Sequence, residues 1–526
     1  MRDFHMPGRS AVYATNGMCA TSHPLAAKTA IDILQSGGNA VDAAIAASVL
    51  LGVCEPAMTG IGGDCFVLVK PAGTDEIIAI NGSGRAPSAL NSADLRAGGH
   101  SVIDPNAATS VTLPGAIDAF CRLSESHGRK GLDAILAPAI AAFEDGVPVA
   151  PRAAFDWNEA QARLQGIARN QYLNNGQRFR SGQKFALPGQ AEVLRRIAKD
   201  GRAAFYEGEV MDDMLSSLNA LGGVHTADDF ASVKATPTTP ISGTYGGFEL
   251  VEHPPNGQGA TALLLANILS HFDISSMEPF GAMRAHIEAE ASKLAYDTRD
   301  RFLADPDHMT KLDRMLSMDT ARALAELIDP HKAMPSARTR SENVHKDTIY
   351  LTVVDRDGMT VSLIYSIFNS FGSGLSSDKF GILFQNRGSG FTLEAGHANE
   401  AAGGKRPMHT IIPAMLRHDG KTVMSFGVMG GAYQPNGHVR VLSNMLDYGM
   451  ELQSALDAPR SFADLGQLKV ERGYAPEVHA ELAEMGHEVI VPDTPIGGAQ
   501  AIWIDTENGV LTGASDPRKD GCALGY

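Results

Sequence analysis

The chain has 526 residues, of which 60 are acidic and 44 are basic, so its formal net charge is −16 at pH 7. Hydrophobic residues make up 44% and charged residues 20%, which is typical of a folded globular protein and excludes wholesale disorder. The acidic balance argues against non-specific binding to nucleic acid or to an anionic membrane surface, because both need clustered positive charge.

Cysteine usage and the N-terminal segment bear on location. The five cysteines form no C-x-x-C pair and are odd in number, so we expect no disulfide framework and a reducing compartment. The first residues contain no apolar h-region, and the longest apolar stretch, 40–54, is too short to cross a bilayer and contains Asp42. These features predict a cytoplasmic protein without a signal peptide or a transmembrane segment.

The first 330 residues are predicted to be mainly helical. Ser22 is a candidate cap for a helix that has Pro24 in its first turn and ends at the glycines 37–38, and Asn39 caps a second, alanine-rich helix. A buried strand follows at 65–69. The clearest later helix covers 285–302, and we expect its acidic residues to form a solvated face. These acidic residues are Glu288, Glu290 and Asp297.

Strands become more frequent after residue 340. A polar, exposed loop is predicted at 336–346, followed by a β-hairpin with strands at 348–354 and 359–366. The next predictions are two apolar runs that extend the strand-rich region, two helices and a strand pair near 500–513. The apolar runs are 381–385 and 422–427, and the helices are 436–450 and 451–458.

Several familiar chemistries are absent. The sequence has no H-E-x-x-H, no G-x-S-x-G and no P-loop, and its 17 histidines give no pair at metal spacing on one clear helix. Residues 256–259 precede a helix and invite a phosphate-binding interpretation, but a plain loop is favoured. We therefore expect neither a metal nor another cofactor.

A hydroxyl at the head of the hairpin is the remaining candidate. Thr348 lies where the polar loop enters the first strand, and pairing across the turn places Ser366 opposite it, within one residue. Because threonine and serine are common in strands, this arrangement alone is a weak functional signal.

Motifs spread over almost the whole chain resemble the γ-glutamyltransferase family. The segment 32–44 is similar to the N-terminal signature of the family, and Asp347-Thr348 is similar to its processing site. The other matching segments, in the order that the family has, are 353–358, 405–407, 429–431, 457–460, 513–518 and 525–526. The resemblance implies an N-terminal nucleophile hydrolase with a four-layer αββα fold, two antiparallel sheets between helical layers.

The resemblance also implies self-cleavage between Asp347 and Thr348. The products would be a large chain, 1–347, and a small chain, 348–526, interleaved as one heterodimeric unit; further oligomerisation is left open. Cleavage frees an α-amine with an ordinary pKa of about 7.7–8.0, which is suited to accept the hydroxyl proton of the same threonine. Thr348 would thus supply both nucleophile and base. By the same resemblance, Ser366 orients it, and Gly430 and Gly431 form the oxyanion hole.

Substrate-binding positions depart from the family pattern. Where typical members hold the α-amino group of a glutamyl moiety, this chain has Phe368, Arg387 and Gly390. Losing a carboxylate and gaining an arginine disfavours a cationic amine and favours an acidic or neutral acyl group. Arg387 is expected either to clamp a substrate carboxylate or to pair with a structural acid.

The carboxylate-binding positions of the family are changed as well. Ser83 stands where the family has an arginine, and Arg85, two residues further on, is a candidate replacement. His409-Thr410 replaces a serine pair, and His409 is interpreted as a polar wall residue of the substrate site. These departures resemble the cephalosporin-acylase-like and oxamate-amidohydrolase branch of the family.

The main functional hypothesis is a self-processing amidohydrolase that acts on a small amide with an acidic acyl group. One alternative is a true γ-glutamyltransferase or glutathione hydrolase that reads its substrate with different residues. A remote alternative is an uncleaved, inactive binding protein with the same fold. We expect a small-molecule substrate and neither nucleic acid nor membrane as a partner.

Overall fold

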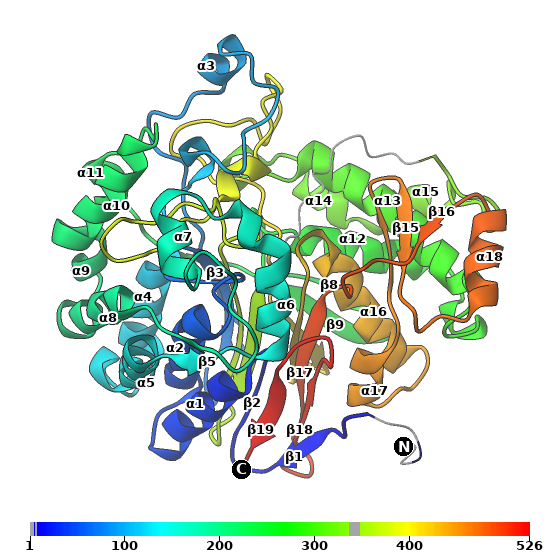
Figure 1. Ribbon diagram of the computed structural model, residues 1–526. Helices are drawn as coiled ribbons and strands as arrows, with labels where there is room; N and C mark the ends of the chain where they lie inside the picture. The colour runs from blue at the N-terminus through cyan, green and yellow to red at the C-terminus, as the bar shows by residue number, and fades with distance from the viewer. Residues whose placement is uncertain (1–4, 6–7, 336–347) are drawn as a thin grey trace.

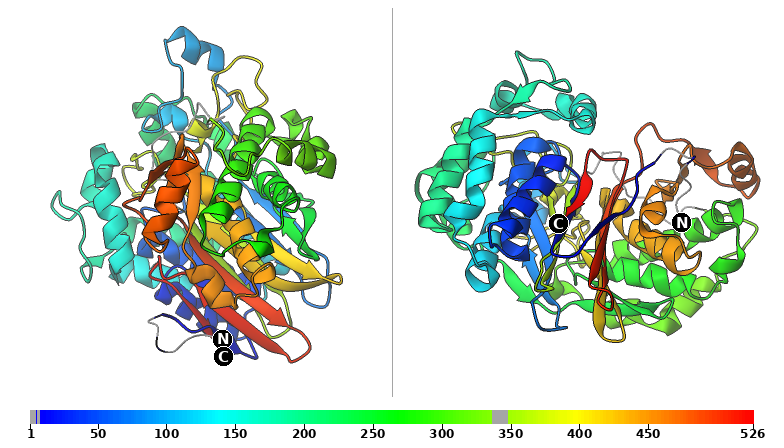
Figure 2. Two further views of the ribbon diagram at one scale, coloured as in Figure 1. Left: turned by 90° about the vertical axis from the view of Figure 1, so that its right-hand side faces the viewer. Right: turned by 90° about the horizontal axis from the view of Figure 1, so that it is seen from below.

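Two antiparallel sheets of seven strands each lie face to face in the centre of the molecule, and helices cover the outer face of each sheet (Figures 1 and 2). The computed structural model describes residue 5 and residues 8–335 and 348–526. The four layers are helices, sheet, sheet and helices, so the αββα architecture expected from the resemblance is confirmed.

The first sheet has the strand order β19-β2-β10-β11-β3-β4-β7, and the second has the order β1-β18-β17-β13-β12-β9-β8. The strands of the first sheet are β2 Met18–Thr21, β3 Asp64–Lys70, β4 Ile78–Gly82, β7 Thr236–Thr238, β10 Ile349–Val354, β11 Thr360–Ser366 and β19 Cys522–Gly525. Those of the second are β1 Val12–Ala14, β8 Ile241–Tyr245, β9 Phe248–Glu252, β12 Ala414–His418, β13 Lys421–Met429, β17 Gly498–Asp505 and β18 Val510–Ser515. Strands from the two ends of the chain therefore mix within each sheet.

The helices divide by sequence between the two outer layers (Figure 1). On the first sheet lie α1 Pro24–Gln35, α2 Ala40–Cys54, α4 Ala116–His127, α5 Leu132–Asp145, α6 Pro151–Ala160, α7 Gly166–Tyr172, α8 Pro188–Asp200, α9 Ala203–Tyr206, α10 Gly208–Ala220 and α11 Ala227–Ala231. On the second lie α12 Gly259–Leu269, α13 Ala282–Phe302, α14 Leu312–Leu316, α15 Met318–Ala325, α16 Gln434–Leu446 and α17 Leu452–Asp457. Beyond α13, helix α18 (Pro476–Glu484) packs with the small sheet β14 Ser461–Asp464, β15 Gln467–Val470 and β16 Glu488–Ile490.

The two N-terminal helices form as predicted, but one cap differs. Asn39 caps α2, and the Asp42 carboxylate accepts a hydrogen bond from the Asn39 N–H, which completes a capping box. The cap of α1 is His23, whose side chain accepts from the N–H of Leu25. Ser22 is one residue too early, and its hydroxyl donates to Glu55 over 2.5 Å instead.

The acidic face predicted for 285–302 is wrong at two positions. Glu288 is buried in α13, where the guanidinium groups of Arg284 and Arg440 pair with it. Glu290 is also buried, and Lys293 pairs with it at 2.6 Å. Helix α16 supplies Arg440 to Glu288, and the Met334 N–H donates to Glu290, so both carboxylates face protein rather than solvent.

Of the other predicted elements, some are confirmed and some are not. The runs at 422–427 and 500–513 lie in β13 and in the pair β17–β18, and the two late helices are α16 and α17. The run 381–385 contains no strand of either sheet, and the strands β7–β9 within the region predicted as helical were missed. The predicted loop at 336–346 lies outside the described residues.

Alternation along β10 decides which side chains face the sheet interface. Ile349, Leu351 and Val353 pack into the core shared with the helices, so the residues between them point to the other sheet. The Thr352 hydroxyl donates to Ser425 Oγ on β13 over 2.6 Å. Thr348 lies four residues before Thr352, so it belongs to the same inward face.

The facing strands β10 and β13 run in opposite directions. The ring of Tyr350 covers Gly427, where an added Cβ would lie 2.4 Å from the ring, so only glycine fits. Moving two residues further along each strand brings Thr348 opposite Met429, which immediately precedes Gly430. Sheet packing therefore juxtaposes the head of β10 with the glycine pair after β13.

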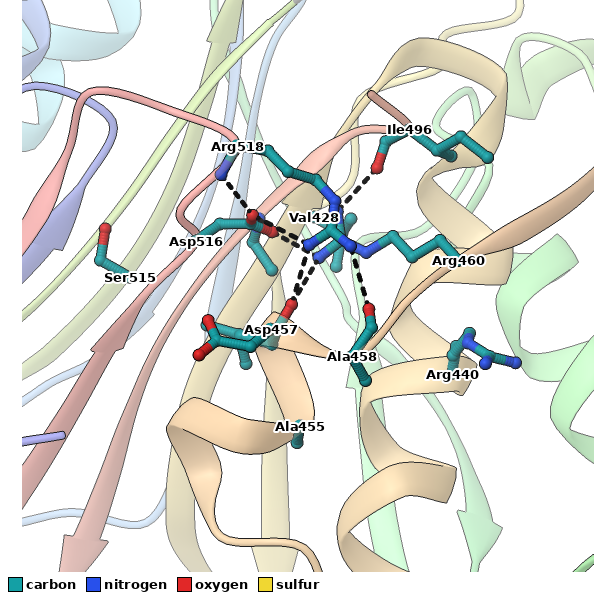
Figure 3. Close-up of polar contacts among 12 residues, drawn as sticks. Val428, Arg440, Ala455, Asp457, Ala458, Arg460, Ile496, Ser515, Asp516 and Arg518 are labelled. Carbon is teal, nitrogen blue, oxygen red and sulfur yellow. Dashed lines mark hydrogen bonds and ion pairs between the residues drawn. The ribbon is translucent and has the colours of Figure 1, made fainter. Parts of the chain in front are cut away.

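Two of the family-like motifs serve the fold rather than the chemistry. Arg460, from the segment 457–460, donates to the Asp516 carboxylate and, over 2.7 Å, to the carbonyl of Ile496 (Figure 3). Arg518 donates to the same carboxylate at 3.2 Å and to the Ala458 carbonyl at 3.0 Å. This buried cluster ties the end of α17 to the end of β18.

A small lobe that includes α3 projects beyond one end of the sheets (Figure 1). It consists of α3 (Ser92–Ala97) and the segment 391–404, which share a minor apolar cluster. Glu400 fastens the two parts, since Arg96 contacts its carboxylate at 2.8 Å. The short 3₁₀ helix η5 (Arg387–Gly390) lies at the base of the lobe, so the lobe holds the segment that carries Arg387.

Candidate active site

Thr348 and Ser366 meet at the head of the hairpin. The Thr348 hydroxyl donates to Ser366 Oγ over 3.3 Å, and the Phe368 N–H donates to the same oxygen over 2.9 Å. Both hydroxyl residues are buried. The register predicted from the sequence therefore brings the two hydroxyls together. Asp347, the other half of the predicted cleavage site, lies outside the described residues.

Asp64 extends this pair into a row of three polar side chains that the sequence analysis missed. Ser366 on β11 pairs directly with Asp64 on β3. Phe66, two residues on, lies in the apolar cluster between the sheets, so Asp64 points to the same inward face as Thr348 and Ser366. The available signal was a lone carboxylate between the glycines 62–63 and an apolar strand.

The Asp64 carboxylate is saturated with donors. Its Oδ1 accepts from the N–H groups of Gly84 and Gly115 and from Gln385 Nε2, over 2.9, 3.2 and 2.9 Å. Burial raises the pKa of Asp64 to about 6, although the charge of Arg387 and these hydrogen bonds act in the opposite direction. Asp64 is thus a buried, hydrogen-bonded carboxyl group whose pKa lies above its ordinary value.

Arg387 is fully buried and only partly satisfied. Its Nη1 donates to Thr410 Oγ1 over 2.9 Å, and its guanidinium carbon lies 3.9 Å from the ring centroid of Phe368. Nε and Nη2 have no hydrogen-bond partner, and no carboxylate of the described residues lies within 4.0 Å of the guanidinium. Burial lowers its pKa to about 9, and Asp64 opposes that shift. Two charged N–H groups are therefore available to an anionic ligand.

His409 packs between Asp64 and the second sheet as a neutral ring. Its Nδ1 accepts from the N–H of Ile411 over 3.3 Å, so the ring proton is on Nε2, which faces Asp64 Oδ2 at 3.3 Å. Burial, together with the charge of Arg387, lowers the pKa of His409 well below its usual value. His409 therefore donates to the carboxylate and does not act as a base.

The glycine pair lies in left-handed backbone at the end of β13. Gly430 has φ 122° and Gly431 has φ 57°. The Gln258 side-chain amide donates to the carbonyl oxygens of Gly431 and Thr410 over 2.9 and 2.6 Å. Arg299 in turn donates to Gln258 Oε1 over 2.7 Å. The loop at 256–259 thus links the glycine pair to the Arg387 contact.

These contacts form one continuous path. Thr348 contacts Ser366, Ser366 accepts from Phe368, and the Phe368 ring lies against Arg387. Arg387 then contacts Thr410, which Gln258 connects to Gly431. The Thr348 hydroxyl, the Arg387 guanidinium and the Gly431 carbonyl are therefore linked through successive contacts.

Arg85 lies apart from this path. Its guanidinium contacts Asp305 at 3.4 Å and the carbonyl of Gly404 at 2.9 Å, and 41% of its side chain is exposed. Arg387, and not Arg85, therefore lies on the contact path that begins at Thr348 and runs through Ser366 and Phe368.

One group of potential metal ligands occurs among the described residues, remote in sequence from this site. His286, Glu290 and His487 bring their ligand atoms within 4.8 Å of one another. His286 and His487 share a hydrogen bond of 2.8 Å, and Lys293 pairs with Glu290 at 2.6 Å. These polar contacts occupy the ligand atoms, so the cluster is complete as a buried hydrogen-bond network.

A search of the described part of the chain finds no helix that combines the length and the apolar character needed to span a bilayer.

The two facing sheets, with a hydroxyl residue heading a central strand, define an N-terminal nucleophile hydrolase fold. The sequence profile described as gamma-glutamyltranspeptidase matches residues 26–526. The chain belongs to the γ-glutamyltranspeptidase family and is an enzyme of its amidohydrolase and transferase type.

Several known proteins are similar to this chain over almost its whole length. The glutathione hydrolase-like YwrD proenzyme of Bacillus subtilis (strain 168) is 35% identical over 529 residues, which cover 98% of this chain and 99% of that protein. The oxamate amidohydrolase proenzyme of Klebsiella pneumoniae is 34% identical over 531 residues, with 98% and 99% coverage. A cephalosporin acylase crystal structure from Bacillus halodurans matches with a TM-score of 0.92 and 35% identity, covering 100% of this chain and 99% of that one.

Proposed function

We propose that this enzyme is a self-processing amidohydrolase in which Thr348 is the nucleophile and Arg387 binds a carboxylate on the acyl group of a small amide. The observation that carries the proposal is the buried Arg387 guanidinium, with two unpartnered N–H groups, on the contact path that begins at Thr348. Leaving such a charge unpaired in a protein interior is costly, so an anionic ligand is its natural partner.

The proposed reaction follows from the arrangement. Cleavage before Thr348 frees its α-amine, which takes the proton of Oγ1 as the oxygen attacks the amide carbonyl. The N–H groups of Gly430 and Gly431 stabilise the negative charge on the tetrahedral intermediate. The C–N bond of the amide then breaks, the Thr348 α-ammonium gives its proton to the departing amine, and an acyl-enzyme ester on Oγ1 remains. Water then attacks the ester by the reverse proton path.

Sheet topology supports a stable two-chain product. In the first sheet, β10 of the proposed small chain (348–526) lies between β11 of the same chain and β2 of the large chain (1–347). β2 also pairs with β19 from the small chain. Separating the chains would break both ladders, so we expect them to remain together as a heterodimer.

The acyl group is proposed to be short and to carry a carboxylate without an α-amine. Phe368 covers one face of the Arg387 guanidinium, and among the described residues its Nε and Nη2 have no hydrogen-bond partner. These two groups could donate side by side to a planar carboxylate. The Klebsiella relative is named for an amide of a short acid, oxamate, which is consistent with this class.

A γ-glutamyl hydrolase or transferase is the second candidate, and Asp64 is the observation that favours it. Arg387 and Asp64 offer opposite charges in one region, as an α-amino acid requires, and the Bacillus relative is named glutathione hydrolase-like. Against it, every oxygen of Asp64 already faces a protein donor.

Intact-mass spectrometry under denaturing conditions tests the nucleophile. Wild-type protein should give two chains that begin at residues 1 and 348, and Thr348→Ala should remain one chain. A single full-length species in both samples would exclude self-processing and support the uncleaved binding protein.

A matched substrate pair tests the acyl group. Glutaryl-p-nitroanilide and γ-glutamyl-p-nitroanilide have the same leaving group but differ at the α-position. We expect the glutaryl amide to react faster, and Arg387→Met to lower kcat/KM at least about 100-fold. Arg85→Met is the control and should retain wild-type rates. Faster turnover of the γ-glutamyl amide, or loss of activity in Arg85→Met alone, would contradict the assignment.

A further inference from the structure

The ladder between β12 and β13 ends just before the glycine pair. Its last pair joins Ala414 to Phe426. Two residues further, the same register places Ile412 opposite Val428, but β12 has not yet begun there and the two strands do not pair. The backbone N–H groups of Ile412 and Val428 belong to buried residues, so each needs a hydrogen-bond partner from outside this ladder.

Two side chains of α16 supply these partners. Gln434 Oε1 accepts from the N–H of Ile412 over 2.9 Å, and His438 Nε2 accepts from the N–H of Val428 over 3.2 Å. Because Gln434 and His438 are four residues apart, they lie on one face of the helix. Gly437 lets the helix approach the strand, since an added Cβ would lie 2.5 Å from Val428 Cγ1. Helix α16 therefore caps both segments where the ladder ends.

Glu252 orients the ring of His438. Since Nε2 accepts from a backbone N–H, the proton of the neutral ring is on Nδ1, which donates to Glu252 Oε1 over 2.7 Å. Both side chains are fully buried. Glu252 is the last residue of β9 and pairs with Ala414 at the start of β12, so its place is set by the same sheet. A proton on Nε2 would instead set two donors against each other at Val428.

The two capped segments carry different parts of the site. Val428 is two residues before Gly430. Ile412 is two residues after Thr410, whose hydroxyl accepts from Arg387 over 2.9 Å. A shift at either cap would therefore change the distance between the proposed oxyanion hole and the anion-binding guanidinium.

We propose that His438 and Gln434 are positioning residues that hold the oxyanion glycines at a fixed distance from Arg387. Glu252 keeps His438 in the tautomer that this role requires. The inference rests on the proposed function, because it takes Gly430 as part of the oxyanion hole. Negative charge on the amide oxygen develops only in the transition state, so the caps should govern that state and not the binding of the acyl carboxylate.

Two variants of similar size separate the contacts of His438. In His438→Gln the side-chain amide ends where Nε2 lies, so its oxygen still reaches Val428. In His438→Asn the amide ends one atom earlier, so it keeps the contact with Glu252 and loses the one with Val428. With glutaryl-p-nitroanilide we expect His438→Asn to lose about 10–100-fold in kcat at a KM within about twofold of the wild type. His438→Gln should stay within about threefold of the wild type in both.

His286→Asn is the matched control. It places the same residue at another buried histidine of a helix, whose ring contacts His487 and the carbonyl of Asp329. This variant should retain wild-type kinetics. Intact-mass spectrometry of each variant gives the fraction cleaved before Thr348, and kcat is expressed per cleaved chain.

A ligand pair isolates the oxyanion hole from the anion site. 4-Boronobutanoate has boron where a glutaryl amide has its carbonyl carbon, and butanoate is the same acid without boron. Thr348 Oγ1 forms a bond to boron while its proton passes to the α-amine, which places a boron-bound hydroxyl in the oxyanion hole. His438→Asn should raise the inhibition constant of the boronate about 10–100-fold and change that of butanoate less than about twofold.

Equal weakening of both ligands, or a raised KM at an unchanged kcat, would overturn the positioning role. If His438→Asn gives no folded, cleaved enzyme, Glu252→Leu makes the same test from the other end of the pair, since the His438 proton is then free to move to Nε2. Glu252→Gln keeps an acceptor and is its control. Failure of both His438→Asn and Glu252→Leu to give folded, cleaved enzyme would show a role in folding or maturation in place of one in catalysis, and would overturn the proposal.

The two proposals fail differently. If Gly430→Ala and the wild type bind the boronate equally, the oxyanion assignment falls, and the positioning role with it. If Gly430→Ala weakens binding of the boronate and His438→Asn does not, the positioning role alone falls, and Thr348, Gly430 and Arg387 keep their assignments.

Discussion

Thr352 on β10 donates its hydroxyl proton to Ser425 on β13, over 2.6 Å and across the interface between the two sheets. Both residues are buried, and their hydrogen bond helps to set the position of the head of β10 relative to β13. The distance between Thr348 and the glycine pair 430–431 therefore depends on a polar contact between two other residues, Thr352 and Ser425.

Removing that contact should loosen the interface measurably. Thr352→Val keeps the shape but removes the hydrogen bond to Ser425, so we expect a loss of about 1 kcal/mol in the free energy of unfolding, measured by urea denaturation. A double-mutant cycle with Ser425→Ala should give a coupling energy of about 1 kcal/mol. Thr422→Val is the control. Thr422 lies on β13, as Ser425 does, and its buried hydroxyl has no partner among the described residues. Equal losses for both threonines would contradict a specific clamp.

Ser366→Ala should impair chemistry more than binding. The Ser366 oxygen receives the Thr348 hydroxyl at 3.3 Å, so its loss leaves the proposed nucleophile without an orienting partner. We expect self-cleavage to slow and kcat to fall about 10–100-fold at an unchanged KM, with Ser366→Thr restoring most of both. Ser362→Ala is a matched control, since that hydroxyl contacts Tyr350 on the same strand face. A raised KM with an unchanged kcat would exclude the orienting role.

Gly430→Ala should disrupt the proposed oxyanion hole. Its φ of 122° is unfavourable for a side chain, and an added Cβ would lie 2.9 Å from the Gly497 Cα. We predict a loss of about 100–1,000-fold in kcat. Gly420→Ala in the β12–β13 turn controls for backbone strain, since Gly420 has φ 78° and open space around it. If the two variants lose activity equally, strain and not the site would be responsible.

Asp516 should make stability depend on pH in the acidic range. Burial by itself would raise the pKa of Asp516, but Arg460 and Arg518 hold it below the usual value. A carboxyl whose pKa is lower in the folded state adds stability above its unfolded pKa, near 3.8, and loses it as the pH falls through the folded value. Asp516→Asn should therefore cost about 3–5 kcal/mol at pH 7.

Urea denaturation at two pH values checks this sign. The difference between the wild type and Asp516→Asn should be largest at pH 7 and should shrink at pH 3, which lies below the unfolded pKa, because there the unfolded wild-type chain has taken up a proton on Asp516. A difference that stays constant or grows on acidification would show that the charge of Asp516 does not stabilise the fold.

The sequence by itself determined the hairpin, the position of Thr348 at its head and the Ser366 partner, because period-two alternation and a turn fix the register locally. Sequence motifs also indicated the family, and the family resemblance implied the four-layer αββα fold. Asn39 was recognisable as a cap because a capping box spans only a few residues. Each of these features depends on contacts between residues close in the sequence or on a motif that can be read directly.

Only the tertiary structure decided which charges face the site. Asp64 joins Thr348 and Ser366 through strand pairing across some 300 residues of chain, and Arg387 is buried with no carboxylate of the described residues within 4.0 Å of its guanidinium. Glu288 was expected at the surface and lies inside, for the same kind of reason. Burial and charge pairing depend on elements distant in the sequence, so no local pattern encodes them.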